Sequence, residues 1–106
     1  MVEAVLKIIE YRKVPVQTGQ VILVRDATAK GFITRQTDMS VTVGGAAEQS
    51  AAFNAGTHFV DLLSDTAGYV LFGSNPTATA ANGIPVQANT YITFAVDPAA
   101  KLSFIA

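Results

Sequence analysis

The sequence predicts a single all-β domain, an antiparallel β-sandwich or barrel, over residues 1–106. Short apolar segments rich in Val, Ile and Phe recur along the chain, and turn-forming residues separate nearly all of them. A chain of 106 residues suits one domain with one core, because it buries roughly two thirds of its unfolded surface. Half of the residues are hydrophobic and 14% are charged, which excludes an intrinsically disordered chain.

The first apolar segment, residues 2–11, fits two kinds of secondary structure. Its apolar residues recur at helical spacing, and Glu3 lies four residues before Lys7, a favourable pair on a helix. The segment is also rich in Val and Ile, lacks an N-cap and ends near Pro15. We expect a strand, because a free helix of one or two turns is marginal in water.

Two further segments carry strand signals in the first half of the chain. Residues 20–25, QVILVR, form a continuous apolar run that is too short for a typical helix and predicts a central strand. Met39, Val41 and Val43 alternate with polar residues. One face of that segment is therefore expected to pack inward.

The second half of the chain predicts two hairpins. Residues 58–63 and 69–73 are strand-like and flank a short polar link that ends in glycine. Residues 91–96 alternate apolar and polar side chains, and the link DPAA then leads to a last strand at residues 102–105. We expect each pair of strands to be neighbours in one sheet.

Two stretches of small residues are expected to connect these strands. Residues 74–89 predict a loop with a turn at Asn82-Gly83, and residues 84–86, IPV, are expected to dock this loop onto a sheet edge, where proline is tolerated. Residues 44–56 are rich in alanine and contain two adjacent glycines. They fit either a flexible surface loop or a short helix.

The scarcity of charge is the main functional signal in the composition. A small monomer needs polar cover, so a surface with few charges predicts that part of it is hidden against other subunits. The net charge of −1 supplies no overall field for nucleic acid or for an anionic membrane. Residues 1–35 hold six basic and three acidic groups, and residues 36–106 hold one basic and five acidic groups. This asymmetry fits orientation on a charged partner as well as scattered solvated charges.

The sequence offers no sign of export or membrane insertion. It contains no cysteine, which rules out a disulfide framework and a thiolate site. The first charged residue is acidic, the wrong order for a secretory signal, and no stretch of about 18 apolar residues exists. We expect synthesis in a cytoplasm without an export signal.

No set of residues predicts an enzyme. His58, Asp61 and Ser64 supply the residue types of a nucleophilic triad, but on a strand the first two point to opposite faces. One histidine, no cysteine and scattered acids make no metal site, and the Gly-Gly pair lacks the Lys-Ser or Lys-Thr step of a phosphate-binding loop. We expect no catalytic residue, no metal and no cofactor.

Tyrosines are the aromatic residues most suited to an interface. Most phenylalanines lie in apolar runs where core packing is expected, whereas Tyr69 and Tyr91 fall on the opposite faces of their strands. An exposed tyrosine is a rigid anchor of the kind that dominates subunit interfaces.

Residues 68–106 carry a family resemblance. They combine an aromatic strand ending in FGS, an Ala/Thr-rich loop, the tripeptide IPV, the strand YITFAV, a turn with proline and a closing KLSFIA. This segment resembles the C-terminal half of small virion proteins of tailed bacteriophages, which include jelly-roll or β-sandwich decoration proteins, also called cement proteins. The resemblance implies a jelly-roll-like β-sandwich. The first half of the chain carries no motif of that family.

The resemblance also implies a structural role. Decoration proteins bind the outside of an assembled shell, often as trimers, and tie neighbouring major capsid proteins together against internal pressure. The implied partners are further copies of this chain and the major capsid protein, and the implied location is the outer capsid surface of the virion. A fibre or tail module that contacts a host glycan or receptor is the alternative.

The expected assembly interface lies in three places. Residues 1–15 are expected to form an N-terminal arm or an edge strand that adds to a neighbour's sheet. The tyrosines and the IPV tripeptide complete it. The expected interface residues are Val2, Leu6, Ile9, Tyr11, Tyr69, Tyr91, Ile84 and Val86.

Overall fold

The computed structural model describes residues 2–12, 16–17, 20–21 and 33–106, which form strands and connecting segments without a helix. The strands are β1 (Glu3–Tyr11), β2 (Val16–Gln17), β3 (Gln20–Val21), β4 (Ile33–Thr42), β5 (Glu48–Gln49), β6 (Phe59–Ser64), β7 (Gly68–Gly73), β8 (Ile84–Val86), β9 (Ile92–Ala95) and β10 (Lys101–Ile105).

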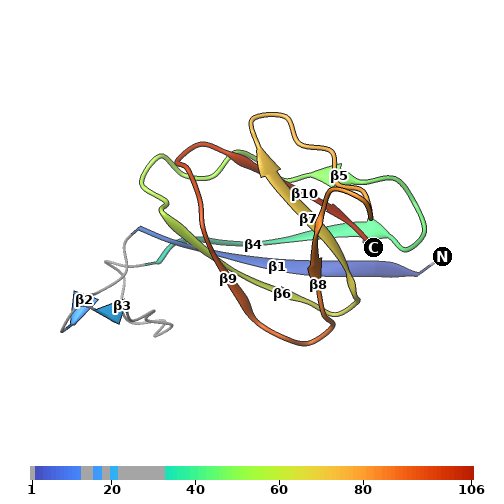
Figure 1. Ribbon diagram of the computed structural model, residues 1–106, viewed down its shortest axis with the longest axis horizontal. Helices are drawn as coiled ribbons and strands as arrows, with labels where there is room; N and C mark the ends of the chain where they lie inside the picture. Colours follow the sequence, from blue (N-terminus) through green and yellow to red (C-terminus); the bar gives the residue numbers. More distant parts are fainter. Residues whose placement is uncertain (1, 13–15, 18–19, 22–32) are drawn as a thin grey trace.

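Eight of these strands form two packed four-stranded sheets (Figure 1). The first sheet has the order β4-β1-β6-β9 and the second sheet the order β5-β10-β7-β8, and all neighbours within them are antiparallel. The prediction of an all-β antiparallel sandwich is confirmed. The jelly-roll connectivity implied by the resemblance stays a prediction.

The N-terminal segment is a strand, as expected, but it is an interior strand. β1 pairs with β4 along its whole length and with β6 from Leu6 to Tyr11. Near its start, the Val5 N–H donates to a carboxylate oxygen of Asp65 at 2.9 Å, and the Asp65 N–H donates to the Val5 carbonyl at 3.1 Å. The expectation that residues 1–15 supply a free arm or edge strand is therefore wrong for β1, because both of its edges are occupied.

Both predicted hairpins are instead crossings between the sheets. β6 and β9 lie in the first sheet, whereas β7 and β10, which follow them, lie in the second. The strands fall where the sequence predicts them, but the predicted pairing of β6 with β7 and of β9 with β10 is wrong. The short link of residues 65–67 passes from one sheet to the other, and sheets in a sandwich lie about 10 Å apart. A short link with turn residues serves such a crossing as well as a hairpin.

The second crossing contains a tight turn. The Ala100 N–H donates to the Asp97 carbonyl at 3.2 Å, and Ala99 has a φ of 63°. Proline at the second position and a positive φ at the third are the features of a type II turn. The turn predicted from the DPAA link is confirmed.

The core lies between the sheets. Alternate residues of the strands turn inward and supply it, and a single Leu or Phe buried there contributes about 1.5–3 kcal/mol. The buried apolar side chains that pack together in this core, among the described residues, are Ala4, Leu6, Ile8, Val41, Phe53, Val60, Leu62, Val70, Val86, Leu102 and Phe104. The ring of Phe72 joins Phe94 to Phe53, with centroid separations of 5.0 and 6.3 Å.

Alternation along β4 is confirmed only in part. Val41 is buried and Met39 is half-buried against the core, but Val43 lies in the turn after β4 and is 40% exposed. Of the predicted central strand at residues 20–25, the structure describes two residues, which form β3 and pair with β2. Residues 22–25 lie outside the described residues.

The two small-residue stretches have different structures. Residues 84–86 form β8 and pair with the edge of β7, so the predicted docking of this tripeptide is confirmed. The turn at Asn82-Gly83 is also present, with the Gly83 N–H donating to the Thr79 carbonyl at 2.8 Å. Residues 44–56 contain no helix, because β5 pairs with β10 in their middle.

Gly68, at the start of β7, is expected to tolerate no side chain. A Cβ there would lie 2.3 Å from the Ile105 carbonyl oxygen and 2.8 Å from the Phe104 ring. At Gly73, the other end of β7, the nearest atom would be Pro76 Cβ at 3.9 Å. We expect Gly68→Ala to lower the free energy of unfolding by about 3 kcal/mol and Gly73→Ala to change it by less than about 1 kcal/mol. Urea denaturation measures both, and equal values would contradict this packing.

Candidate functional site

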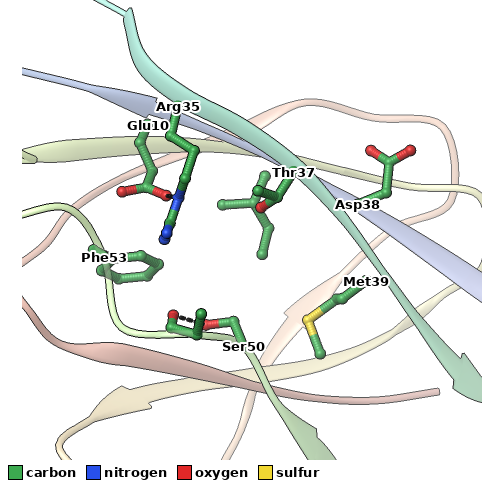
Figure 2. A pocket seen from close by; sticks show the side chains of 9 residues that line it. Glu10, Arg35, Thr37, Asp38, Met39, Ser50 and Phe53 are labelled. Atoms are coloured by element: carbon green, nitrogen blue, oxygen red, sulfur yellow. Dashed lines mark hydrogen bonds and ion pairs between the residues drawn. The ribbon is translucent and has the colours of Figure 1, made fainter.

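A cleft of about 240 Å³ opens between the inner face of β4 and residues 50–53 (Figure 2). It exists because β4 has ten residues and β5 has two, so the second sheet leaves part of β4 uncovered. Its lining combines four apolar residues with five polar or charged ones. The apolar residues are Ile8, Met39, Ala51 and Phe53, and the others are Glu10, Arg35, Thr37, Asp38 and Ser50.

Strand alternation decides which side chains of β4 face the cleft. The register of β1 with β4 sets Glu10 opposite Arg35, and both lie on the inner face of the first sheet. Asp38 lies opposite Lys7 on the outer face. Figure 2 accordingly shows Asp38 at the rim, pointing away from the cleft.

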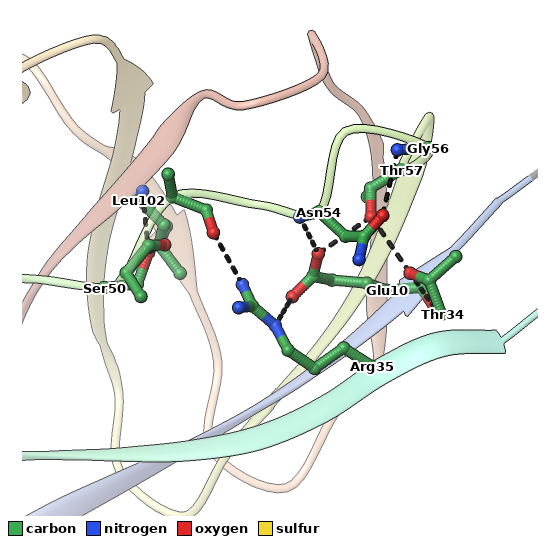
Figure 3. A network of polar contacts seen from close by, with 10 residues as sticks. Glu10, Thr34, Arg35, Ser50, Asn54, Gly56, Thr57 and Leu102 are labelled. Carbon is green, nitrogen blue, oxygen red and sulfur yellow. Dashed lines mark hydrogen bonds and ion pairs between the residues drawn. The ribbon is translucent and has the colours of Figure 1, made fainter.

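Glu10 is the centre of a polar network at one end of the cleft (Figure 3). Its side chain is fully buried, and its Oε2 forms an ion pair with Nε of Arg35. Its Oε1 accepts hydrogen bonds of 2.8 Å from the Asn54 N–H and from the Thr57 hydroxyl. Nη2 of Arg35 in turn donates to the Ala52 carbonyl at 2.8 Å.

The network holds the segment before β6 against β1 and β4. The Thr34 hydroxyl extends it, because it donates to the Glu10 carbonyl at 3.2 Å and lies 3.0 Å from the Thr57 hydroxyl. A buried carboxylate is tolerated when a cation and hydrogen-bond donors compensate for its lost hydration. Both oxygens of the Glu10 side chain have such partners, which makes this carboxylate part of the framework of the cleft.

The triad residue types do not meet. His58 is exposed, and its Nδ1 lies 2.5 Å from the Arg12 carbonyl oxygen and 3.0 Å from that of Gly56. Asp61 is buried on the outer face of the first sheet, where it accepts a hydrogen bond of 3.3 Å from the Tyr11 hydroxyl.

Ser64 does not complete the set either, because its buried hydroxyl donates to the Thr66 carbonyl at 2.5 Å. Within residues 2–12 and 33–106, no group of three or more His, Cys, Asp or Glu side chains is placed to hold a metal ion.

The expected interface residues divide into three groups. Val2, Ile84 and Tyr91 are exposed, by 68%, 40% and 42%. Ile9 and Tyr69 are half-buried.

Leu6, Tyr11 and Val86 are buried within the chain itself. Leu6 and Val86 belong to the core between the sheets, whereas the buried Tyr11 donates its hydroxyl hydrogen bond to the Asp61 carboxylate. Those three side chains have no surface to offer a partner.

The ion pair of Glu10 with Arg35 was not predicted from the sequence. One signal for it exists, because Glu10 has the same parity as Leu6 and Ile8 on β1 and must therefore share their inward face. The identity of its partners depends on the long-range pairing with β4, which local pattern does not reveal.

Comparisons with protein-family models, with curated proteins and with solved structures found no match. A helix able to cross a membrane is absent from the described part of the chain.

Removing the cation of Arg35 is expected to destabilise the protein. Arg35→Met leaves the buried carboxylate of Glu10 without its charge partner and should lower the free energy of unfolding by about 3 kcal/mol. Glu10→Leu combined with Arg35→Met should recover much of that loss, because an apolar pair leaves no buried charge. Arg12→Met, at an exposed arginine, serves as the control and should change it by less than about 0.5 kcal/mol. Thermal and urea denaturation measure all three variants. An Arg35→Met protein as stable as the Arg12→Met control would contradict the role given to the pair of Glu10 and Arg35.

Proposed function

We propose that this protein is a structural component of a tailed-phage virion that associates with itself and decorates the outer capsid surface, where it binds the major capsid protein. The observation that carries the proposal is the outer edge of β4, a strand of ten residues at the end of the first sheet, with which no other described strand pairs on that side. A long unpaired strand presents a row of backbone donors and acceptors, which is a template for pairing with another chain.

The other sheet edges are poorer templates. β9, at the opposite end of the first sheet, has four residues. In the second sheet β5 has two residues, and β8 has three with Pro85 in the middle. Short edge strands and proline are common means of preventing edge pairing. β4 has neither form of protection.

The use of the buried polar groups also favours a structural role. Glu10 joins β1 to β4 and to the segment before β6, and Asp61 joins β6 to Tyr11 of β1 and to the Thr93 hydroxyl of β9. Both carboxylates therefore cross-link strands. The scarcity of charge at the surface points the same way, since it suits a protein that works in an assembly.

A capsid lattice makes modest contacts sufficient. Each subunit on a shell meets several neighbours, so avidity replaces the need for one tight site. We expect the shell contact to use exposed apolar side chains outside β4. In the described part of the chain the large ones are Val2, Val43, Ile84 and Tyr91. The trimeric state and the jelly-roll connectivity are implied by the resemblance. An antiparallel pair of two β4 strands joins two copies, so a trimer would need a further interface.

Mixing the purified protein with shells that lack it, followed by imaging, tests the proposal. We expect density at regular lattice positions and a higher temperature of shell disruption, because a bound subunit links neighbouring capsid proteins. Shells that already carry the protein are the control and should gain no density. Density only at a tail or vertex would overturn the decoration role and favour a fibre or tail module that contacts a host glycan or receptor.

A further inference from the structure

We infer that β4 pairs antiparallel with β4 of a second copy, around a two-fold axis that passes through Thr37. The inference rests on the proposed self-association and assigns it to the outer edge of β4. The strand that pairs with this edge is β4 of a second copy of this chain.

The hydrogen bonding of β1 fixes which backbone groups of β4 are free for such pairing. The Val43 N–H donates to the Val2 carbonyl at 2.9 Å, just beyond the end of β4. Because hydrogen-bonded pairs alternate along an antiparallel ladder, Val41, Met39 and Thr37 also direct their backbone groups toward β1.

Gln36, Asp38 and Ser40 then direct theirs to the outer edge. All three residues are exposed. The free donors and acceptors of β4 are therefore accessible to another strand.

Only some registers satisfy these groups. In a two-fold pair, residues with outward backbone groups must face each other. Two such registers overlap nine of the ten residues of β4, and they set Gln36 against either the partner's Asp38 or the partner's Ser40. The second register places Asp38 directly opposite the partner's Asp38, and like charges in that position are destabilising.

The first register centres on Thr37 and sets no like charges against each other. The partner's Gln36 amide then lies beside the Asp38 carboxylate, which is also opposite Lys7 of β1. Thr34 faces the partner's Ser40 on the same side of the sheet. Charge and hydrogen-bonding complementarity therefore select the Thr37-centred register.

The cleft is continuous with this edge. On the inner face, the selected register sets Arg35 opposite the partner's Met39. Met39 is half-buried in the single chain and lines the cleft together with Arg35. The added strand extends the first sheet across the mouth of the cleft, so the partner's Met39 covers a part of β4 that the short β5 leaves open.

A cysteine at position 37 tests this register directly, because the protein has no cysteine of its own. In the non-hydrogen-bonded pair at the axis, the two Cα atoms lie about 4.5 Å apart, within the range that a disulfide spans. Ser40→Cys is the matched control, since Ser40 is equally exposed on β4 but lies roughly 20 Å from its copy in this register. We expect Thr37→Cys to form a covalent dimer under mild oxidation at least about tenfold faster than Ser40→Cys. Equal rates would overturn the inference.

Charge variants at position 36 supply a second test that needs no cross-link. Gln36→Lys faces the partner's Asp38 with an opposite charge, and Gln36→Asp faces it with a like charge, twice in each dimer. We expect the first to tighten and the second to weaken dimerisation, by about three- to tenfold each, in analytical ultracentrifugation. The reverse order, or no difference, would overturn the register.

Shell binding measured on the same variants separates this inference from the proposed function. If Thr37→Cys cross-links no faster than Ser40→Cys while the protein still decorates shells, the inference is overturned and the proposed function stands. Cross-linking at position 37 without shell binding supports the inference and overturns the decoration role. Trimers in solution without this cross-link, or protection of β4 only on shells, would assign the edge to another partner and overturn the inference.

Discussion

A glutamate on the inner face of an interior strand is the constraint on which the open side of the sandwich depends. Burying a carboxylate without partners costs several kcal/mol, so both oxygens of Glu10 must be satisfied inside the protein. They are satisfied by Arg35 of β4 and by Asn54 and Thr57 before β6. This arrangement holds the segment before β6 against one end of the cleft, while the short β5 leaves the cleft open beside Met39.

Local pattern predicted the strands well and their pairing poorly. β1, β6, β7, β9 and β10 all fall in segments that alternation and β-branched residues indicate. A short link with turn residues fits a hairpin and a crossing alike. The choice between them is made by packing between residues far apart in sequence, such as Val60 and Leu62 of the first sheet with Val70 of the second. Likewise, nothing within residues 1–15 distinguishes an edge strand from an interior one.

The candidate site was predicted less completely than the fold. Val2, Ile84 and Tyr91 are exposed as an interface requires, whereas Leu6 and Tyr11 are buried. An edge strand at residues 1–15 would have exposed more of its apolar side chains than the interior strand β1 does. The long edge belongs to β4, of which the sequence predicts only the second half, from the alternation of Met39, Val41 and Val43. Its significance appears only when β1 is seen to be paired on both sides, which leaves β4 as the end of the sheet.

Hydrogen exchange of the β4 amides over a range of protein concentrations tests the central claim most directly, that this edge joins two copies. The amides of Thr37 and Met39 are bonded to β1 and should be protected at every concentration. Those of Gln36, Asp38 and Ser40 should exchange rapidly in dilute protein and become protected as dimers form. Rapid exchange of these three amides at concentrations where the protein is fully associated would contradict the account.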